Sequence, residues 1–178
     1  MFSIILATHD SERALVPTLA ALVPGATAGI VREVIVADGG SRDQTEQVAD
    51  IAGCRFLASA EPRGSRLKAA AELARGDWLM FLAPGLVPGP TWIDATIAFT
   101  DAAGNRPRAG VFARDSGLVQ RALRLLGALP DGGSLMIRKS FYHEYGHRDA
   151  ADPERDLLRR IGRRRLVTLR ATATIADI

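Results

Sequence analysis

Short apolar runs alternate with longer helical patterns along the first hundred residues, and this alternation constrains the fold more than any other feature. The runs are strand-length segments, namely FSIILAT, REVIVADGG, CRFLAS and DWLMFLAP. After each run, apolar residues recur at helical spacing, over 11–22, 41–53, 65–74 and 91–103. Strands that alternate with helices in this way form a parallel sheet with helices on both faces. We therefore predict an α/β fold with a mostly parallel sheet.

Local signals support these boundaries and the domain organisation. Ser11 suits the N-cap of the first helix, and Gly53 suits the residue that ends the second. The stretch PGLVPGP reads as a loop after the fourth strand. No internal repeat, low-complexity tract or long linker divides the chain, so we expect one domain over residues 1–178.

Composition excludes several classes of protein. The chain is 47% hydrophobic and 24% charged, as is usual for a globular domain. The single cysteine, Cys54, excludes an internal disulfide, suits a reducing cytoplasm and is expected in the core. Asp10, Glu12 and Arg13 interrupt the first apolar run, which argues against a signal peptide. Since no apolar segment approaches the roughly 18 residues that span a bilayer, we expect a soluble, cytoplasmic protein.

Basic residues gather near the C-terminal end, in LLRRIGRRRLVTLR. Such a run forms a solvated helix face, or it contacts phosphates or an anionic membrane surface. Aromatic residues are not interleaved with the charges, so we do not expect nucleic acid as a partner. The stretch 117–129, GLVQRALRLLGAL, has arginines on an otherwise apolar helix pattern. It either packs on the sheet or lies on a membrane, so peripheral contact with the inner membrane face stays open.

The residues at the carboxyl ends of the predicted strands decide the function, because parallel sheets bind ligands there. These segments are Ala7–Asp10, Asp38–Asp43, Glu61–Arg66 and Ala83–Gly85. Asp38 closes an apolar strand, where a buried carboxylate is costly, so we expect it at an edge or against a ligand. Gly39 and Gly40 would let a backbone or a nucleobase approach closely.

At these positions the chain resembles the nucleotide-sugar half of the inverting family-2 glycosyltransferases, which have the Rossmann-like GT-A fold. The resemblance rests on SIILATHDSERAL, EVIVADGGSRDQT and ARGDWLMFLAPGLVPGP. The middle stretch is the most specific, because in the family a strand ending in Asp, followed by D/G-G-S-x-D-x-T, binds the nucleotide base. The alternative is that DGGSRD is only a glycine-rich turn before a helix. The DGGS variant, with PRGSRLKAAAELARGD after it, looks most like a small bacterial subgroup often encoded near radical-SAM proteins.

This resemblance implies a division of the chain and a set of binding residues. Residues 1–103 would be the nucleotide-binding half, and residues 104–178 a shortened acceptor half. Ala7, Thr8 and Gly39 would line the nucleoside pocket, and Asp38 would accept a hydrogen bond from the base. The donor would be a sugar linked to UDP or GDP, and the acceptor is not indicated.

The chain departs from the family where a metal usually binds. Relatives carry Asp-x-Asp after the fourth strand, and its carboxylates hold a divalent cation against the diphosphate. Here those positions are Ala83, Pro84 and Gly85. Helix N-terminal amides and the cations Arg63, Arg66 and Lys68 could offset the diphosphate charge instead. The resemblance then implies either metal-independent transfer, with no cofactor, or a degenerate fold that binds without turnover.

The last third carries a weaker resemblance and one competing motif. The family's general base corresponds to Glu154, or to Asp152 if the register slips, although both acids could simply open a helix. The motif HEYGH at 143–147 fits the zinc-hydrolase pattern H-E-x-x-H. The family register places a helix over 140–146, ended by Gly146 before the second histidine. We therefore expect His143 and His147 to be surface residues, with a zinc hydrolase as the third hypothesis.

Overall fold

The structure is a computed structural model that describes residues 1–104, 106–114 and 133–176. The strands are β1 (Phe2–Thr8), β2 (Val31–Asp38), β3 (Arg55–Ala58), β4 (Trp78–Leu82), β5 (Leu86–Pro88), β6 (Ala109–Arg114), β7 (Ser134–Arg138) and β8 (Leu166–Ile175). The helices are α1 (Glu12–Thr27), α2 (Thr45–Ile51), α3 (Arg63–Leu73), α4 (Trp92–Ala103), α6 (Lys139–Tyr145) and α7 (Pro153–Ile161), with a 3₁₀ turn, η1, at Arg163–Arg165.

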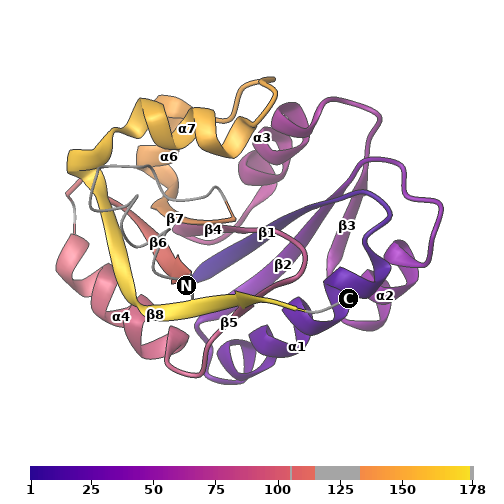
Figure 1. The fold of residues 1–178 in the computed structure, drawn as a ribbon, viewed down its shortest axis with the longest axis horizontal. Helices are drawn as coiled ribbons and strands as arrows, with labels where there is room; N and C mark the ends of the chain where they lie inside the picture. Colours follow the sequence, from indigo (N-terminus) through magenta and orange to yellow (C-terminus); the bar gives the residue numbers. More distant parts are fainter. Residues whose placement is uncertain (105, 115–132, 177–178) are drawn as a thin grey trace.

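The described strands form one sheet in the order β3-β2-β1-β4-β7-β6-β8-β5, with helices on both faces (Figure 1). Neighbouring strands from β3 through β2 and β1 to β4 are parallel. β7 joins β4 in the antiparallel sense, β6 follows β7 antiparallel, β8 runs parallel to β6, and β5 pairs antiparallel with β8. The predicted α/β fold with a mostly parallel sheet is confirmed. The carboxyl ends of β1, β2 and β4 consequently meet at one edge.

The central strand is buried on both faces, because each face carries its own helices. Ile4 and Leu6 of β1 pack in the core cluster that includes Leu15 of α1. Ile5 of the same strand packs on the other face, with Leu67 of α3. Alternation of this kind follows from the two-residue period of a strand. Each fully buried leucine or isoleucine contributes roughly 1.5–3 kcal/mol, so these two layers fix the strand ends in space.

The predicted strands and helices that fall on described residues are confirmed, but several boundaries were wrong. α1 continues to Thr27, beyond the expected end at Leu22, with Pro17 and Pro24 inside it. The expected loop PGLVPGP contains the short strand β5, which pairs with β8. Ser11 occupies the N-cap position without a side-chain cap bond. Cys54 is half-buried and packs against the core, close to the expectation.

The basic run does not form one helix. α7 ends at Ile161, and Gly162 follows with a φ of 80°, a backbone conformation that glycine adopts readily. The arginines of η1 come next. The residues LVTLR then form the first half of strand β8, in which buried and exposed side chains alternate. The predicted helix over 117–129 lies outside the described residues. Within the described part, no helix has the length and apolarity needed to cross a bilayer.

Candidate functional site

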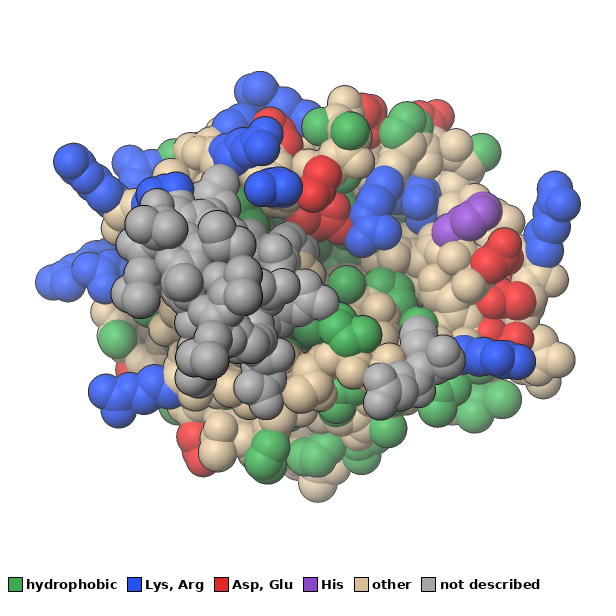
Figure 2. Space-filling view, in the orientation of Figure 1, with side chains coloured by type: hydrophobic (Ala, Val, Ile, Leu, Met, Phe, Trp, Pro, Cys, Tyr) green, Lys and Arg blue, Asp and Glu red, His purple; other side chains and the backbone are tan. Residues whose placement is uncertain are grey.

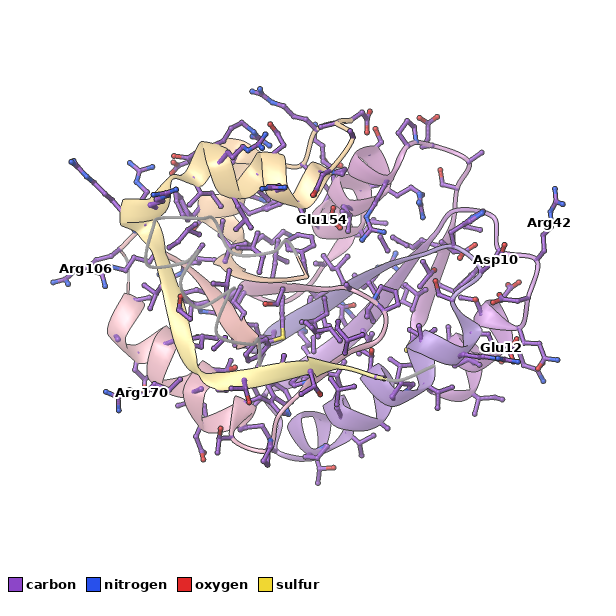
Figure 3. All side chains as sticks on the ribbon, viewed as in Figure 1. Asp10, Glu12, Arg42, Arg106, Glu154 and Arg170 are labelled. Carbon is purple, nitrogen blue, oxygen red and sulfur yellow. The ribbon has the colours of Figure 1, made fainter. Side chains whose placement is uncertain are left out.

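A cavity of about 680 Å³ opens beyond the carboxyl ends of β1 and β4, at the edge that the topology predicts for a ligand. Its walls come from the ends of both strands, from the start of α1 and from α3 (Figure 3). The lining residues are Ala7, His9, Asp10, Ser11, Glu12, Arg13, Ala14, Asp43, Arg63, Ala83 and Pro84. Carboxylates, a histidine and arginines thus line a hollow large enough for part of a nucleotide.

Asp38 is buried and holds the turn that follows β2. Its carboxylate accepts hydrogen bonds from the Thr8 hydroxyl at 2.7 Å, the Gly40 amide at 2.8 Å, and the Ser41 amide and hydroxyl at 2.7 and 2.5 Å. Burial raises the pKa of Asp38, but these hydrogen bonds outweigh it and hold the pKa below its usual value. Four donors occupy the carboxylate's ordinary acceptor positions. A nucleobase could bond to Asp38 only by displacing one of them.

The loops after β1 and β2 are locked together by reciprocal hydrogen bonds. The Asp10 amide donates to the Ser41 hydroxyl at 2.8 Å, and the Arg42 amide donates to the Asp10 carboxylate at 2.7 Å. The Glu12 amide donates to the Asp43 carboxylate at 2.9 Å. Asp10 has a φ of 46°, a strained value for a residue other than glycine. The wall of the cavity is therefore preorganised.

Arg66 lies across the ends of β1 and β2. Its Nη1 donates to the carbonyls of Ala37 at 2.6 Å and Thr8 at 3.0 Å, and its Nε donates to the Glu61 carbonyl at 3.1 Å. A Cβ on Gly39 would lie 2.8 Å from Arg66 Nη2, so the absent side chain at Gly39 makes room for the guanidinium. Burial, and then the nearby charge of Arg63, lower the pKa of Arg66.

Arg63 and Glu154 form an ion pair that joins α3 to α7. Arg63 donates from Nε at 2.8 Å and from Nη2 at 2.5 Å to the same oxygen, Glu154 Oε1. The Arg63 side chain is 39% exposed and that of Glu154 12%. Arg63 Nη1 also lies 3.4 Å from the Ala7 carbonyl. Glu154 lies where α7 approaches α3 (Figure 3). The proposed phosphate ligand and the proposed general base are therefore in direct contact.

The start of α3 is capped from a distant segment. The Asp149 carboxylate accepts hydrogen bonds from the Ser65 amide at 2.7 Å and the Ser65 hydroxyl at 2.8 Å. At Gly64 the approach is so close that a Cβ would lie 2.2 Å from the Arg148 carbonyl oxygen. Since an acidic side chain already occupies the Ser65 amide, this amide does not face the cavity as a phosphate donor. The Ser65 amide is therefore not free to bind a phosphate, and a contribution from other amides at this helix N-terminus stays a prediction.

Lys68 and Asp152 lie apart from the cations and acids expected beside them. Lys68 is exposed and, at 3.6 residues per turn, points roughly 140° around α3 from Arg63. Asp152 is exposed and caps α7, because its carboxylate accepts the Arg155 amide at 2.9 Å. Of the two candidate bases, Glu154 is the one that bonds to a cavity-lining residue, Arg63.

The segment that follows β4 has no side-chain oxygen. Ala83 and Pro84 line the cavity, and the Gly85 amide donates to the Ala14 carbonyl and the Thr18 hydroxyl, both at 2.9 Å. Among the residues that the structure describes, no group of three histidine, cysteine or acidic side chains could hold a metal ion. The residues present at 83–85 therefore do not fit the divalent cation that the family resemblance implies.

The two histidines of HEYGH do not share a helix. α6 ends at Tyr145, and Gly146 follows with a φ of 57°, as predicted. His147 is 4% exposed, so the expectation that it lies at the surface was wrong; His143 is exposed, as expected. The His147 ring lies 2.9 Å from the Tyr142 hydroxyl and edge-on to Phe81. Tertiary packing of the segment after α6, which the local sequence does not reveal, buries this ring.

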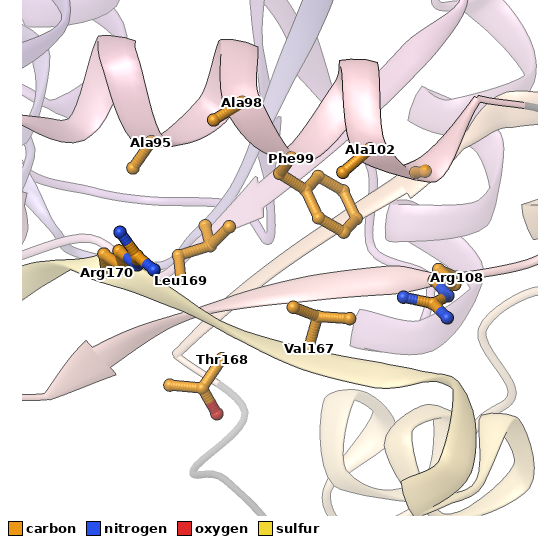
Figure 4. A pocket seen from close by; sticks show the side chains of 10 residues that line it. Ala95, Ala98, Phe99, Ala102, Arg108, Val167, Thr168, Leu169 and Arg170 are labelled. Atoms are coloured by element: carbon orange, nitrogen blue, oxygen red, sulfur yellow. The ribbon is translucent and has the colours of Figure 1, made fainter.

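Two other surface features lie away from the cavity. A hollow of about 220 Å³ between α4 and β8 is lined mainly by alanines, Phe99, Val167 and Leu169, with arginines at its margin (Figure 4). Lys and Arg side chains also gather over α7, η1 and the start of β8, in the upper left of Figure 2. The exposed arginines of that region are Arg155, Arg159, Arg163, Arg164 and Arg165.

The sequence placed His9 and Asp43 in segments at the strand ends without giving them a role, and both line the cavity. It missed Glu12, which also lines the cavity, and Asp149, which supports α3. The predicted helix start after the first strand was a usable signal for Glu12, because first-turn residues face the same edge. Asp149 gave no signal, since it is 84 positions from its partner Ser65.

Comparisons with known proteins agree with this geometry. The family model described as "Glycosyl transferase family 2" matches residues 3–146. Glucosyl-3-phosphoglycerate synthase from Mycobacterium tuberculosis, solved with Mn²⁺, UDP and glucosyl-3-phosphoglycerate, has a TM-score of 0.75 at 20% identity over 100% of this chain and 72% of that one. Its complex with Mn²⁺ and UDP-glucose gives 0.76 at 20% identity, over 99% and 70%.

A second protein has the same fold. TarS 1–349 of S. aureus in complex with UDP has a TM-score of 0.75 at 17% identity, covering 98% of this chain and 60% of that one. No curated protein matches the sequence. At these identities the likeness shows the fold alone, and that fold is the predicted GT-A fold.

Proposed function

The chain belongs to glycosyl transferase family 2, and from this premise we propose that it binds a nucleotide sugar in the cavity beyond β1 and β4 and transfers the sugar to an acceptor. One observation carries the proposal: Arg63, which lines the cavity, is in contact with Glu154. A cation for a leaving diphosphate and a carboxylate for an acceptor hydroxyl thus lie together, as the two halves of a glycosyl transfer require.

The donor of the proposed reaction is a UDP-linked or GDP-linked sugar. The uridine nucleotides in the similar structures favour UDP. We place the nucleoside against the wall formed by Ala7, Thr8 and the turn at 38–41. Because four donors of its own chain occupy Asp38, its proposed role is to position this turn. Arg66 supports the same wall, because it donates to the carbonyls of Thr8, Ala37 and Glu61.

The diphosphate would be held by arginine. Arg63 lines the cavity, and Arg66 is close enough that Arg63's charge lowers its pKa. Ala83, Pro84 and Gly85 offer no carboxylate to a cation, which supports metal-independent binding. The Mn²⁺ in the similar structures favours metal-dependent binding instead. Binding with Mn²⁺ and with EDTA separates the two cases.

Glu154 is the proposed general base. As the acceptor hydroxyl attacks the anomeric carbon, Glu154 takes its proton, the bond from that carbon to the diphosphate oxygen breaks, and the nucleoside diphosphate leaves. Attack on the face opposite the leaving group inverts the anomeric configuration. Asp152 is the weaker candidate, because it caps α7.

A second candidate function is a binding or scaffold protein on the same fold, which would hold the nucleotide without turnover. The missing carboxylates at 83–85 favour it. Contact of the exposed arginines at 155–165 with an anionic membrane, and the likeness to the subgroup found near radical-SAM proteins, stay predictions.

Calorimetric titration with UDP, GDP, UDP-glucose and a GDP-sugar, each in Mn²⁺ and in EDTA, tests the donor site. We expect a uridine nucleotide to bind in both buffers and to bind at least tenfold more weakly to Arg63→Ala. Lys68→Ala, on another face of α3, is the matched control. The absence of binding to every nucleotide would remove the donor site. Binding with no release of UDP from UDP-glucose, for any acceptor tried, would favour the scaffold function.

A further inference from the structure

The ion pair between Arg63 and Glu154 uses the edge of the guanidinium that is best suited to a phosphate. Nε and Nη2 form one of the paired donor edges of an arginine, and both donate to Glu154 Oε1. Such an edge binds a carboxylate or a phosphate in the same bidentate geometry. With this edge on Glu154, Arg63 Nη1 makes a longer contact with the Ala7 carbonyl, at 3.4 Å.

The same contact also occupies one of the two carboxylate oxygens of the proposed general base. Glu154 Oε1 accepts two N–H groups, so Arg63 engages this oxygen and only Oε2 is left for an acceptor hydroxyl. Glu154 is also only 12% exposed, which leaves little access for an acceptor while Arg63 covers it. The paired state therefore occupies the phosphate-binding edge of Arg63 and restricts the access of an acceptor to Glu154.

Resting on the proposed function, we propose that Glu154 and the donor diphosphate compete for Arg63, so that donor binding releases Glu154 to act as the base. Arg63 thereby positions Glu154, and the two substrates bind in order, with the donor first. A diphosphate outcompetes the carboxylate because it carries more negative charge and more acceptor oxygens.

The surroundings allow Arg63 to exchange partners and keep Arg66 in place. The Arg63 side chain is 39% exposed and lines the cavity, so its head group can turn toward a ligand. Arg66 is fixed by three carbonyls, and the first turn of α3, which carries Arg63, is held where Asp149 accepts the Ser65 amide. When Glu154 leaves the pair, a diphosphate supplies the negative charge that two adjacent arginines require.

The competition predicts that removing the base's charge tightens donor binding. Calorimetric titration of UDP into wild type and Glu154→Gln, in EDTA, should show an affinity about threefold to fivefold higher in the variant, the range set by the loss of a partly exposed ion pair. Arg63→Gln should bind UDP more weakly, and Arg63→Gln with Glu154→Gln should bind no better than Arg63→Gln alone. Asp156→Asn is the matched control, because it breaks a different arginine–carboxylate pair of α7, the one with Arg160 at 2.8 Å.

The outcomes separate the two proposals. Equal or weaker UDP affinity in Glu154→Gln, with wild type binding UDP and both proteins melting at similar temperatures, overturns the competition and leaves the donor site intact. A similar gain in Asp156→Asn also overturns it, since the effect would then be a general loss of negative charge. Failure of every protein to bind UDP removes the proposed function, and the competition with it.

Discussion

Gly64→Ala tests how tightly the segment before α7 is fitted to α3. The new Cβ would lie 2.2 Å from the Arg148 carbonyl oxygen, 2.5 Å from its carbon and 2.9 Å from Asp149 Oδ1. Ordinary carbon–oxygen contacts are no shorter than about 3.3 Å, so the segment must move away by about 1 Å. That displacement acts on backbone, which cannot rotate aside, and it stretches the hydrogen bonds between Asp149 and Ser65.

The magnitude follows from three opposing effects. Overpacking costs about 1–3 kcal/mol, and weakening the Asp149 cap adds about 1 kcal/mol. Alanine regains about 1 kcal/mol over glycine inside a helix. The free energy of unfolding should fall by about 1–3 kcal/mol, which lowers the melting temperature by roughly 2–12 °C for a chain of this size.

Urea and thermal denaturation followed by circular dichroism measure this change. Lys68→Ala, at an exposed position on the same helix, should stay within about 0.5 kcal/mol of wild type. A Gly64→Ala protein that is as stable as wild type, or more stable by the helix-propensity gain alone, would refute the close fit between α3 and Arg148.

Three further substitutions test the site. Asp38→Asn should lower the free energy of unfolding by about 2–4 kcal/mol in urea denaturation, because an amide nitrogen would face donors that the carboxylate now accepts; an unchanged stability would contradict the role of Asp38 in the turn. Burial, with Arg160 and Arg63 nearby, lowers the pKa of His147 to about 3, whereas the unfolded value is about 6.5. Between these values the unfolded chain binds a proton that the folded chain does not. The free energy of unfolding should therefore decrease as the pH is lowered, by up to about 1.4 kcal/mol per pH unit, and His147→Gln should lose that part of the slope. Equal slopes in the two proteins would show that His147 is not buried as a neutral ring. Asp152→Ala should cost about 1 kcal/mol as a lost helix cap and leave UDP affinity unchanged, whereas a loss of UDP affinity would show that it belongs to the site.

The features of the fold that could be predicted are those specified by residues close together in the sequence. Strand-length apolar runs fixed β1, β2, β3 and β4, and Gly146 marked the end of α6. The turn at 38–41 was also readable, because Asp38 closes a strand and Ser41 follows at turn spacing. In each case the signal and the structure that it specifies lie within a few residues of each other.

The features that could not be predicted depend on distant partners. β5 exists because β8, nearly ninety residues later, pairs with it at Leu86↔Ile175. Likewise the burial of His147 depends on Phe81, and the cap of α3 on Asp149. The pairing of Arg63 with Glu154 joins residues 91 positions apart. Both had been identified as site residues, but nothing in their sequence neighbourhoods shows that they meet.

A crystal structure of the protein with UDP, grown in EDTA, tests the central claim most directly. The account predicts uracil against the turn at 38–41, and the diphosphate on Arg63, in the cavity beyond β1 and β4, with Glu154 released from Arg63. UDP bound anywhere else on the molecule, for example in the hollow between α4 and β8, would contradict the donor site. UDP in the cavity with Arg63 still on Glu154 would contradict the role of Arg63.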